Sequence, residues 1–117
     1  MFFYKDFENL KISWNEVFFA AKTQYFVYIY GEYCGHCQNI KKQVLEFTDD
    51  EIFPIYFVPF VDEIPVKTDI ENTIGKTDIS SIYIKGIPTL LEIDFGVLVQ
   101  NVAGEQNVLA LLYSKKK

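Results

Sequence analysis

Cys34 and Cys37 are the only cysteines of this 117-residue chain, and they flank its only histidine, His36. An apolar run at residues 25–30 precedes the pair, and a stretch with helical periodicity at residues 38–47 follows it. A C-x-x-C pair between a strand and a helix is typical of a thiol–disulfide redox site. The two cysteines therefore indicate both a strand–helix unit and a candidate chemistry.

The spacing suits that chemistry. The thiolate is the nucleophile, and a helix N-terminus favours an anion because its first N–H groups are unpaired. We expect Cys34, at the outer edge of the helix start, to attack a substrate disulfide. Cys37, one turn further in, would then resolve the mixed disulfide. Gly35 and His36 would shape the loop, and a protonated His36 would favour the thiolate and make the pair more oxidising.

A structural disulfide and a zinc site compete with a redox site as interpretations of the cysteine pair. A structural disulfide across so short a loop would constrain the unfolded chain little. A zinc site commonly needs four ligands, whereas this segment offers two cysteines and one histidine. Neither alternative explains the position of the pair at the start of a helix as well as redox chemistry does.

Composition excludes several classes of function. The net charge is −5 and the chain has no arginine, which argues against nucleic-acid binding. No stretch approaches the roughly 18 apolar residues of a membrane span. The first residues lack the features of a signal peptide, so we expect a cytoplasmic protein if Met1 is the natural start, and an extracytoplasmic one if a leader was removed.

Hydrophobic patterning predicts one α/β domain over residues 1–117. Strands are expected at residues 25–30, 55–61, 89–93 and 97–102, and helices at 14–22, 38–47, 78–83 and 105–114. Residues 1–12 should form a short strand or helix at one edge, and residues 62–77 a long connection. The first two strands should be parallel through a right-handed crossover, and the last two should form an antiparallel hairpin.

Three segments together resemble thioredoxin-fold oxidoreductases over nearly the whole chain. They are Gly-Glu-Tyr-Cys-Gly-His-Cys at residues 31–37, Gly-Ile-Pro-Thr at residues 86–89, and the hairpin at residues 96–104. The Gly-His dipeptide is that of protein disulfide isomerase domains. The resemblance implies a three-layer α/β/α sandwich with a mixed central sheet and a C-terminal hairpin plus helix.

The resemblance also implies a substrate groove. Pro88 matches the family's cis-proline, which faces the dithiol and leaves the backbone of Ile87 able to pair with an extended peptide. Tyr33 and Gly104 would complete the rim of that groove. The implied partners are protein or peptide disulfides and dithiols, with a reductase that recycles a monomeric protein. No metal or organic cofactor is expected.

Three features depart from the family pattern. Tyr28 occupies the position of a buried acid that relays the proton of the second cysteine. Lys42 replaces a helix-kinking proline, and residues 62–77 are about ten residues longer than the pattern. We expect a thiol–disulfide oxidoreductase whose direction the sequence leaves open. The alternative is a thioredoxin-fold protein-binding module with little turnover.

Overall fold

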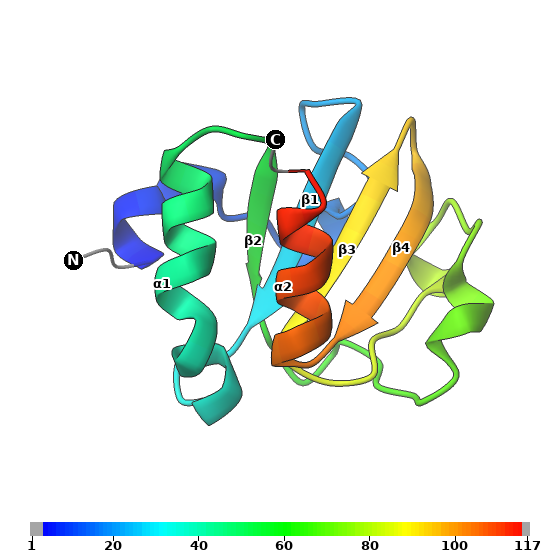
Figure 1. Ribbon diagram of the computed structural model, residues 1–117. Coiled ribbons are helices and arrows are strands. Elements are labelled where there is room, and N and C mark those ends of the chain that lie inside the picture. Colours follow the sequence, from blue (N-terminus) through cyan, green and yellow to red (C-terminus); the bar gives the residue numbers. More distant parts are fainter. Residues whose placement is uncertain (1–3, 116–117) are drawn as a thin grey trace.

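A strand of almost entirely buried side chains lies inside the sheet of this protein. The computed structural model describes residues 4–115. Four strands form one sheet in the order β2-β1-β3-β4 (Figure 1). Their bounds are Gln24–Tyr30 (β1), Ile55–Pro59 (β2), Thr89–Asp94 (β3) and Val97–Ala103 (β4). The described residues also form two α-helices, Gly35–Asp49 (α1) and Glu105–Tyr113 (α2), and four 3-10 segments. The 3-10 segments are Tyr4–Leu10 (η1), Trp14–Glu16 (η2), Ile70–Thr73 (η3) and Ile79–Ser81 (η4).

The pairing of β1 gives the sheet its mixed character. β1 runs parallel to β2, with Tyr28 opposite Phe57, and antiparallel to β3, with Tyr28 opposite Leu90. β3 and β4 form the expected antiparallel hairpin. Every β1 side chain from Tyr25 to Tyr30 is buried. A strand covered on both faces needs no alternation of polar and apolar residues, which explains its continuous aromatic and β-branched run.

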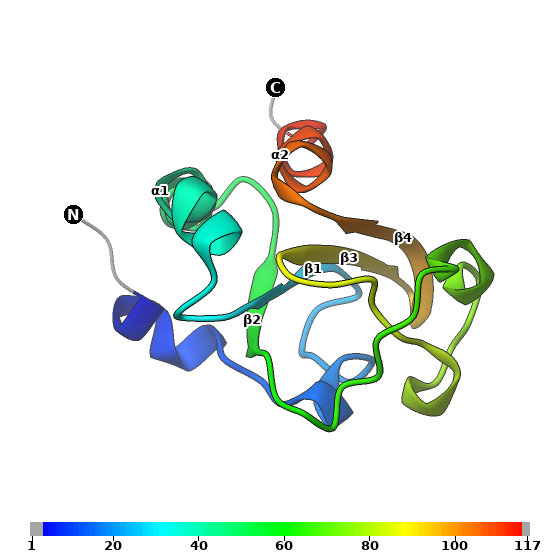
Figure 2. The ribbon, with the colours of Figure 1, turned by 90° about the horizontal axis from the view of Figure 1, so that it is seen from below.

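Both α-helices cover the same face of the sheet (Figure 2). Alternate residues of β1 point to that face because successive side chains of a strand point in opposite directions. The core on this face contains Phe26, Tyr28 and Tyr30 of β1, Cys37, Ile40, Val44 and Leu45 of α1, and Val108 and Leu112 of α2. The second cysteine is therefore part of the hydrophobic core. None of the helices within residues 4–115 has the length and apolar composition needed to cross a membrane.

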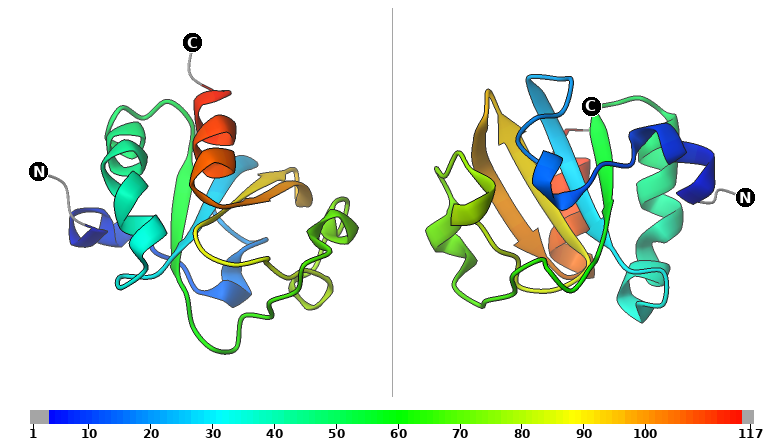
Figure 3. Two further views of the ribbon diagram at one scale, coloured as in Figure 1. Left: turned by 60° about the horizontal axis from the view of Figure 1, so that its bottom comes forward. Right: turned by 180° about the vertical axis from the view of Figure 1, so that it is seen from behind.

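The opposite face is covered by short 3-10 turns and irregular chain instead of α-helices (Figure 3). Its core joins Tyr25, Val27 and Ile29 of β1 to Trp14, Val17, Ile64, Ile82 and Ile84 of the covering segments. The mixed sheet, hairpin and final helix confirm the expected fold class. The helices expected at residues 14–22 and 78–83 are wrong, since only η2 and η4 form there.

Local contacts stabilise one turn in each of these two segments. The backbone N–H of Ser13 donates to the Glu16 carboxylate at 2.9 Å, which is one of the two contacts of a capping box. Burial of Trp14 and Val17 then anchors the segment against the sheet. In the second segment Asp78 accepts hydrogen bonds from the hydroxyls of Ser80 and Ser81. The chain becomes extended at Ile82, directly after η4.

Both edge strands of the sheet are protected. On the β2 edge, the N–H of Ile12 donates to Phe57 O at 2.8 Å, directly after η1. On the β4 edge, Leu98 exchanges backbone hydrogen bonds with Gly75 and Lys76. Exposed strand edges invite pairing with other chains, and these contacts remove that opportunity. Residues 4–12 thus form the expected edge element, and the first three residues of the predicted segment lie outside the described part.

The long connection at residues 62–77 has a structural role. Its Val66 forms a bridge with Ile84, and Ile64 is buried against the sheet. The amide of Asn101 on β4 donates to Thr73 Oγ1 and to Tyr83 O, both at 3.0 Å. The connection therefore contributes Ile64 to the core on this face and is fastened to β4 through Asn101.

A turn of two left-handed residues joins β3 and β4. Phe95 has φ +50° and Gly96 has φ +79°. Two-residue hairpins favour this geometry, but asparagine or glycine adopts it more readily than phenylalanine. The Phe95 side chain is 70% exposed, so little burial offsets the backbone cost.

We expect Phe95→Asn to raise the free energy of unfolding by about 0.5–1 kcal/mol, because asparagine tolerates the left-handed conformation better. Denaturant unfolding of the reduced protein measures this change. Phe19→Asn is the matched control: Phe19 is 81% exposed, and its φ is not positive. An equal gain in the control would attribute the effect to lost exposed aromatic surface instead of backbone geometry.

Candidate active site

The candidate site lies where three chain segments meet at one end of the sheet, the end that faces the viewer in Figure 2. The parallel strands β1 and β2 both end there. The first leads into α1 through Cys34, and the segment ending at Pro88 enters β3 at the same end. Gly104 then ends the hairpin and starts α2. Topology thus brings together residues up to 70 positions apart.

Cys34 is the N-cap residue of α1 and is half-buried. Its sulfur accepts a hydrogen bond from the Cys37 N–H at 3.2 Å, and its thiol faces Ile87 O at 3.8 Å. The first of these is the contact through which a helix start stabilises an anion. The sulfur expected to act as nucleophile therefore lies at a helix N-terminus with part of its surface open.

Cys37 occupies a different environment. Its side chain is fully buried, and both cysteines are free thiols. Burial raises the pKa of Cys37 to about 12, and its contact with Cys34 adds to the shift. A buried thiol of this kind is a poor nucleophile toward reagents in solution. It remains one helical turn from Cys34, within the reach that resolution of a mixed disulfide requires.

Pro88 and Gly104 form the opposite wall of the site. The Ile87–Pro88 peptide bond is cis, and the N–H of Gly104 donates to Pro88 O at 2.9 Å. Gly104 has φ +93°, a conformation that other residues adopt at a cost. The carbonyl of Ile87 faces Cys34, so the residues expected to form the groove lie beside the attacking sulfur.

Gly31 matters for packing in a way the sequence did not reveal. A Cβ atom at this position would lie 2.8 Å from Ile87 Cδ1 and 3.4 Å from Cys34 Cβ. Glycine therefore allows the end of β1 to approach the segment before Pro88. Gly31 belongs to the motif at residues 31–37, but its close contact is with Ile87, which is 56 positions away in the sequence.

The hydrogen bond of His36 is made to α2, and none is found between its ring and the Cys34 sulfur. Its Nδ1 lies 2.6 Å from Glu105 Oε2 in the first turn of α2, and Asn39 Nδ2 donates to the same oxygen at 3.3 Å. The hydrogen bond with His36 lowers the pKa of Glu105, and Asn39 contributes. Nothing in the sequence pairs these residues, because His36 and Glu105 are 69 positions apart.

The remaining predicted residues flank the dithiol. Tyr33 is fully exposed beside Cys34, and Gly35 is exposed at the first position of α1. Tyr28 lies in the apolar core under the site, with its ring stacked 5.9 Å from that of Tyr30. No aspartate or glutamate is buried among the residues whose burial is described. The core beneath the cysteines thus holds phenols in place of a carboxylate.

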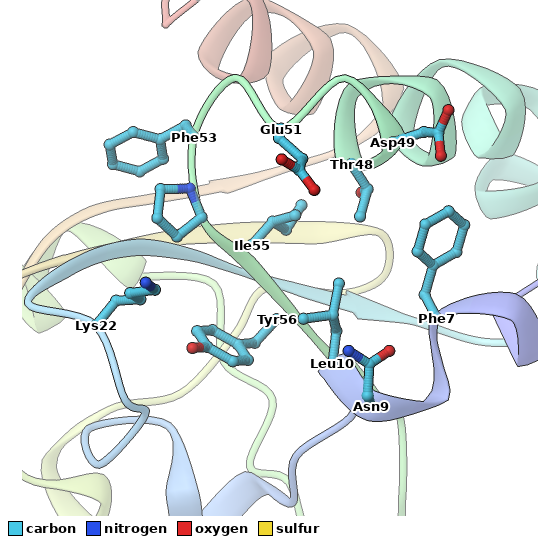
Figure 4. Close-up of a pocket in the computed structure, with 11 residues that line it drawn as sticks. Phe7, Asn9, Leu10, Lys22, Thr48, Asp49, Glu51, Phe53, Ile55 and Tyr56 are labelled. Carbon is cyan, nitrogen blue, oxygen red and sulfur yellow. The ribbon is translucent and has the colours of Figure 1, made fainter.

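A cavity of about 480 Å³ lies at the other end of the molecule, between η1, the end of α1 and the start of β2 (Figure 4). Phe7, Leu10, Lys22, Glu51 and Tyr56 are among its lining residues, and neither cysteine borders it. This cavity is therefore separate from the candidate site. Within residues 4–115 no three His, Cys, Asp or Glu side chains are grouped to hold a metal ion.

The sheet order, the two helices on one face and the C-x-x-C pair at the start of α1 define a thioredoxin fold. Solved structures agree over most of the chain. Thioredoxin f from spinach chloroplast (short form) is 15% identical, with a TM-score of 0.58 over 92% of this chain and 93% of that one. Mitochondrial thioredoxin 3 from Saccharomyces cerevisiae (oxidized form) is 18% identical, with a TM-score of 0.57 over 91% and 92%.

Chlamydomonas reinhardtii thioredoxin f2 is 16% identical, with a TM-score of 0.53 over 92% of this chain and 95% of that one. No protein-family model matches the sequence. No curated protein matches it either. At identities this low the likeness defines the fold, and the chemistry must be argued from this chain's own residues.

We expect iodoacetamide at pH 7.5 to modify Cys34 and leave Cys37 unmodified, because Cys37 is buried and its pKa is about 12. Peptide mass spectrometry of the reduced protein measures both sites. Cys34→Ser serves as the control and should remain almost unlabelled. Modification of Cys37 before Cys34 would contradict the assigned roles.

Proposed function

We propose that this protein is a thiol–disulfide oxidoreductase that exchanges disulfides with protein or peptide substrates. One observation carries the proposal. A half-buried thiol caps a helix and faces the Ile87 carbonyl, while a second thiol lies fully buried one turn behind it. This asymmetry suits one attacking and one resolving cysteine. A structural disulfide would not need it.

The reaction balances as two successive exchanges. The Cys34 thiolate attacks one sulfur of a substrate disulfide, forms a mixed disulfide and releases the other substrate sulfur as a thiolate. Cys37 then loses its proton and attacks Cys34 Sγ, which releases the second substrate thiolate. The substrate gains two electrons and two protons, and the protein ends with a Cys34–Cys37 disulfide. The reverse sequence oxidises a substrate dithiol.

The second step is the demanding one in this chain. Cys37 must ionise in an apolar environment that raises its pKa to about 12. Tyr28 lies in that environment where the family pattern has an acid, and a phenol at neutral pH is a weak proton acceptor. We therefore expect the resolution of the mixed disulfide to limit turnover.

Substrate recognition is proposed along the open side of Cys34. Tyr33 offers a fully exposed aromatic ring, and the backbone before Pro88 offers pairing to an extended peptide. We propose a monomer that is recycled by a reductase in a reducing, cytoplasmic environment. The potential of the Cys34–Cys37 couple, measured in a glutathione buffer, decides whether it works as reductant, oxidant or isomerase.

We expect the wild-type protein to accelerate the reduction of insulin disulfides by dithiothreitol, followed by turbidity. Cys37→Ser should lose turnover and accumulate a mixed disulfide with insulin, visible on a non-reducing gel, because nothing resolves it. Cys34→Ser should lose turnover without accumulating that adduct. Absence of acceleration by the wild type would favour the protein-binding module over the oxidoreductase.

A further inference from the structure

The side chain of His36 makes its hydrogen bond to α2 and none to the dithiol. It is 74% exposed, and its Nδ1 lies 2.6 Å from Glu105 Oε2. The Cys34 thiol donates to Ile87 O, and its sulfur accepts from the Cys37 N–H. The residue closest in sequence to both thiols that can carry a positive charge is thus turned toward another helix.

We propose that Glu105 is a positioning residue that holds the imidazole of His36 away from the Cys34 sulfur and thereby limits how strongly the site stabilises the thiolate. The inference rests on the proposed function, because it concerns the reactivity and redox poise of the same dithiol. It assigns to α2 a control over chemistry that takes place at the start of α1.

The position of the imidazole matters as well as its charge. A charged imidazole stabilises a nearby thiolate more as the distance shrinks. The 2.6 Å hydrogen bond between His36 Nδ1 and Glu105 Oε2 opposes movement of the ring. Glu105 has its side chain 27% exposed and a second contact from Asn39, so the carboxylate is itself held. Removing it frees the ring to approach Cys34.

The Glu105 carboxylate has two alternative roles: it could act only as a nearby negative charge, or it could only fasten α1 to α2. A pure charge effect on the thiolate is the same whether or not His36 is present, provided the imidazole stays charged and does not move. A pure fastening effect should also follow the loss of Asn39. If the effects of mutating positions 36 and 105 on the reactivity of Cys34 are not additive, then Glu105 acts on Cys34 through His36.

The test is a double-mutant cycle of Glu105→Ala and His36→Asn, measured as the rate of Cys34 alkylation by iodoacetamide at pH 5.5. A mildly acidic pH in general favours the charged form of an imidazole, and all four proteins are compared at the same pH. Besides Glu105 on α2, the ionisable groups near His36 include the two thiols and the exposed Glu32, which are close to it in the sequence. Glu32 is therefore included as a control. The equilibrium constant of the couple with glutathione is measured on the same four proteins.

We expect Glu105→Ala to accelerate alkylation more in the protein with His36 than in the His36→Asn protein. The expected difference is about two- to fivefold, the range for a surface charge interaction. The couple should become more oxidising in the same order. Glu105→Gln preserves the shape of the side chain and should give a smaller change in the same direction, which guards against a folding defect in the alanine variant.

Two matched controls accompany the cycle. Asn39→Ala removes the second contact of the same carboxylate oxygen but leaves the shorter contact with His36, so it should change the Cys34 rate much less than Glu105→Ala does. Glu32→Ala removes a nearby carboxylate that makes no contact with His36, so its effect should be equal with and without the imidazole.

Equal effects of Glu105→Ala in both backgrounds, or a slower rate in the His36 background, would overturn the restraint. A change caused by Asn39→Ala as large as any effect of Glu105→Ala would reduce the contact to a helix fastening. These rates are read at Cys34 alone. A failure to reduce insulin would instead count against the proposed function. The alkylation rates of the double-mutant cycle could still be measured and interpreted.

Discussion

The rest of this fold depends on the burial of β1 on both faces. Six consecutive residues from Tyr25 to Tyr30 are removed from water, four of them aromatic. Each aromatic residue buries up to about 150–250 Å² of largely apolar surface, which is worth several kcal/mol at about 25 cal/mol per Å². No single layer could cover such a strand. Two neighbouring strands and two cover layers follow from this requirement, and the end of β1 then fixes the position of Cys34.

The strands, the two α-helices and the core between them were predicted well, because the hydrophobic patterns of these segments are regular. β1 was identified by its continuous apolar run, and α1 by periodic Ile40 and Val44. The hairpin was identified by the turn around Gly96. The helices predicted at residues 14–22 and 78–83 do not form, and the reason is physical. A capping residue and a few apolar residues can start one helical turn. A longer helix also needs tertiary packing along its length, because short helices have little stability of their own.

The candidate site divides in the same way. The roles proposed for Cys34 and Cys37 followed from spacing at a helix start, and the structure places them in correspondingly different environments. The positions of Gly31 and Glu105 could not be foreseen, since each depends on a contact between segments more than 50 residues apart. Local patterns predict which atoms can react, whereas the fold decides which distant groups surround them.

The irregular cover layer has a consequence for how stability is distributed. On the helix side, amides of α1 and of the central strands belong to continuous hydrogen-bonded arrays. On the other side, residues 62–84 are held by scattered bonds such as Lys67 N–H to Ile84 O and Ile84 N–H to Pro65 O. Segments with isolated bonds open locally at lower cost than central strands do. Hydrogen exchange should therefore divide the molecule into a slow half that contains the dithiol and a faster half that can open without disturbing it.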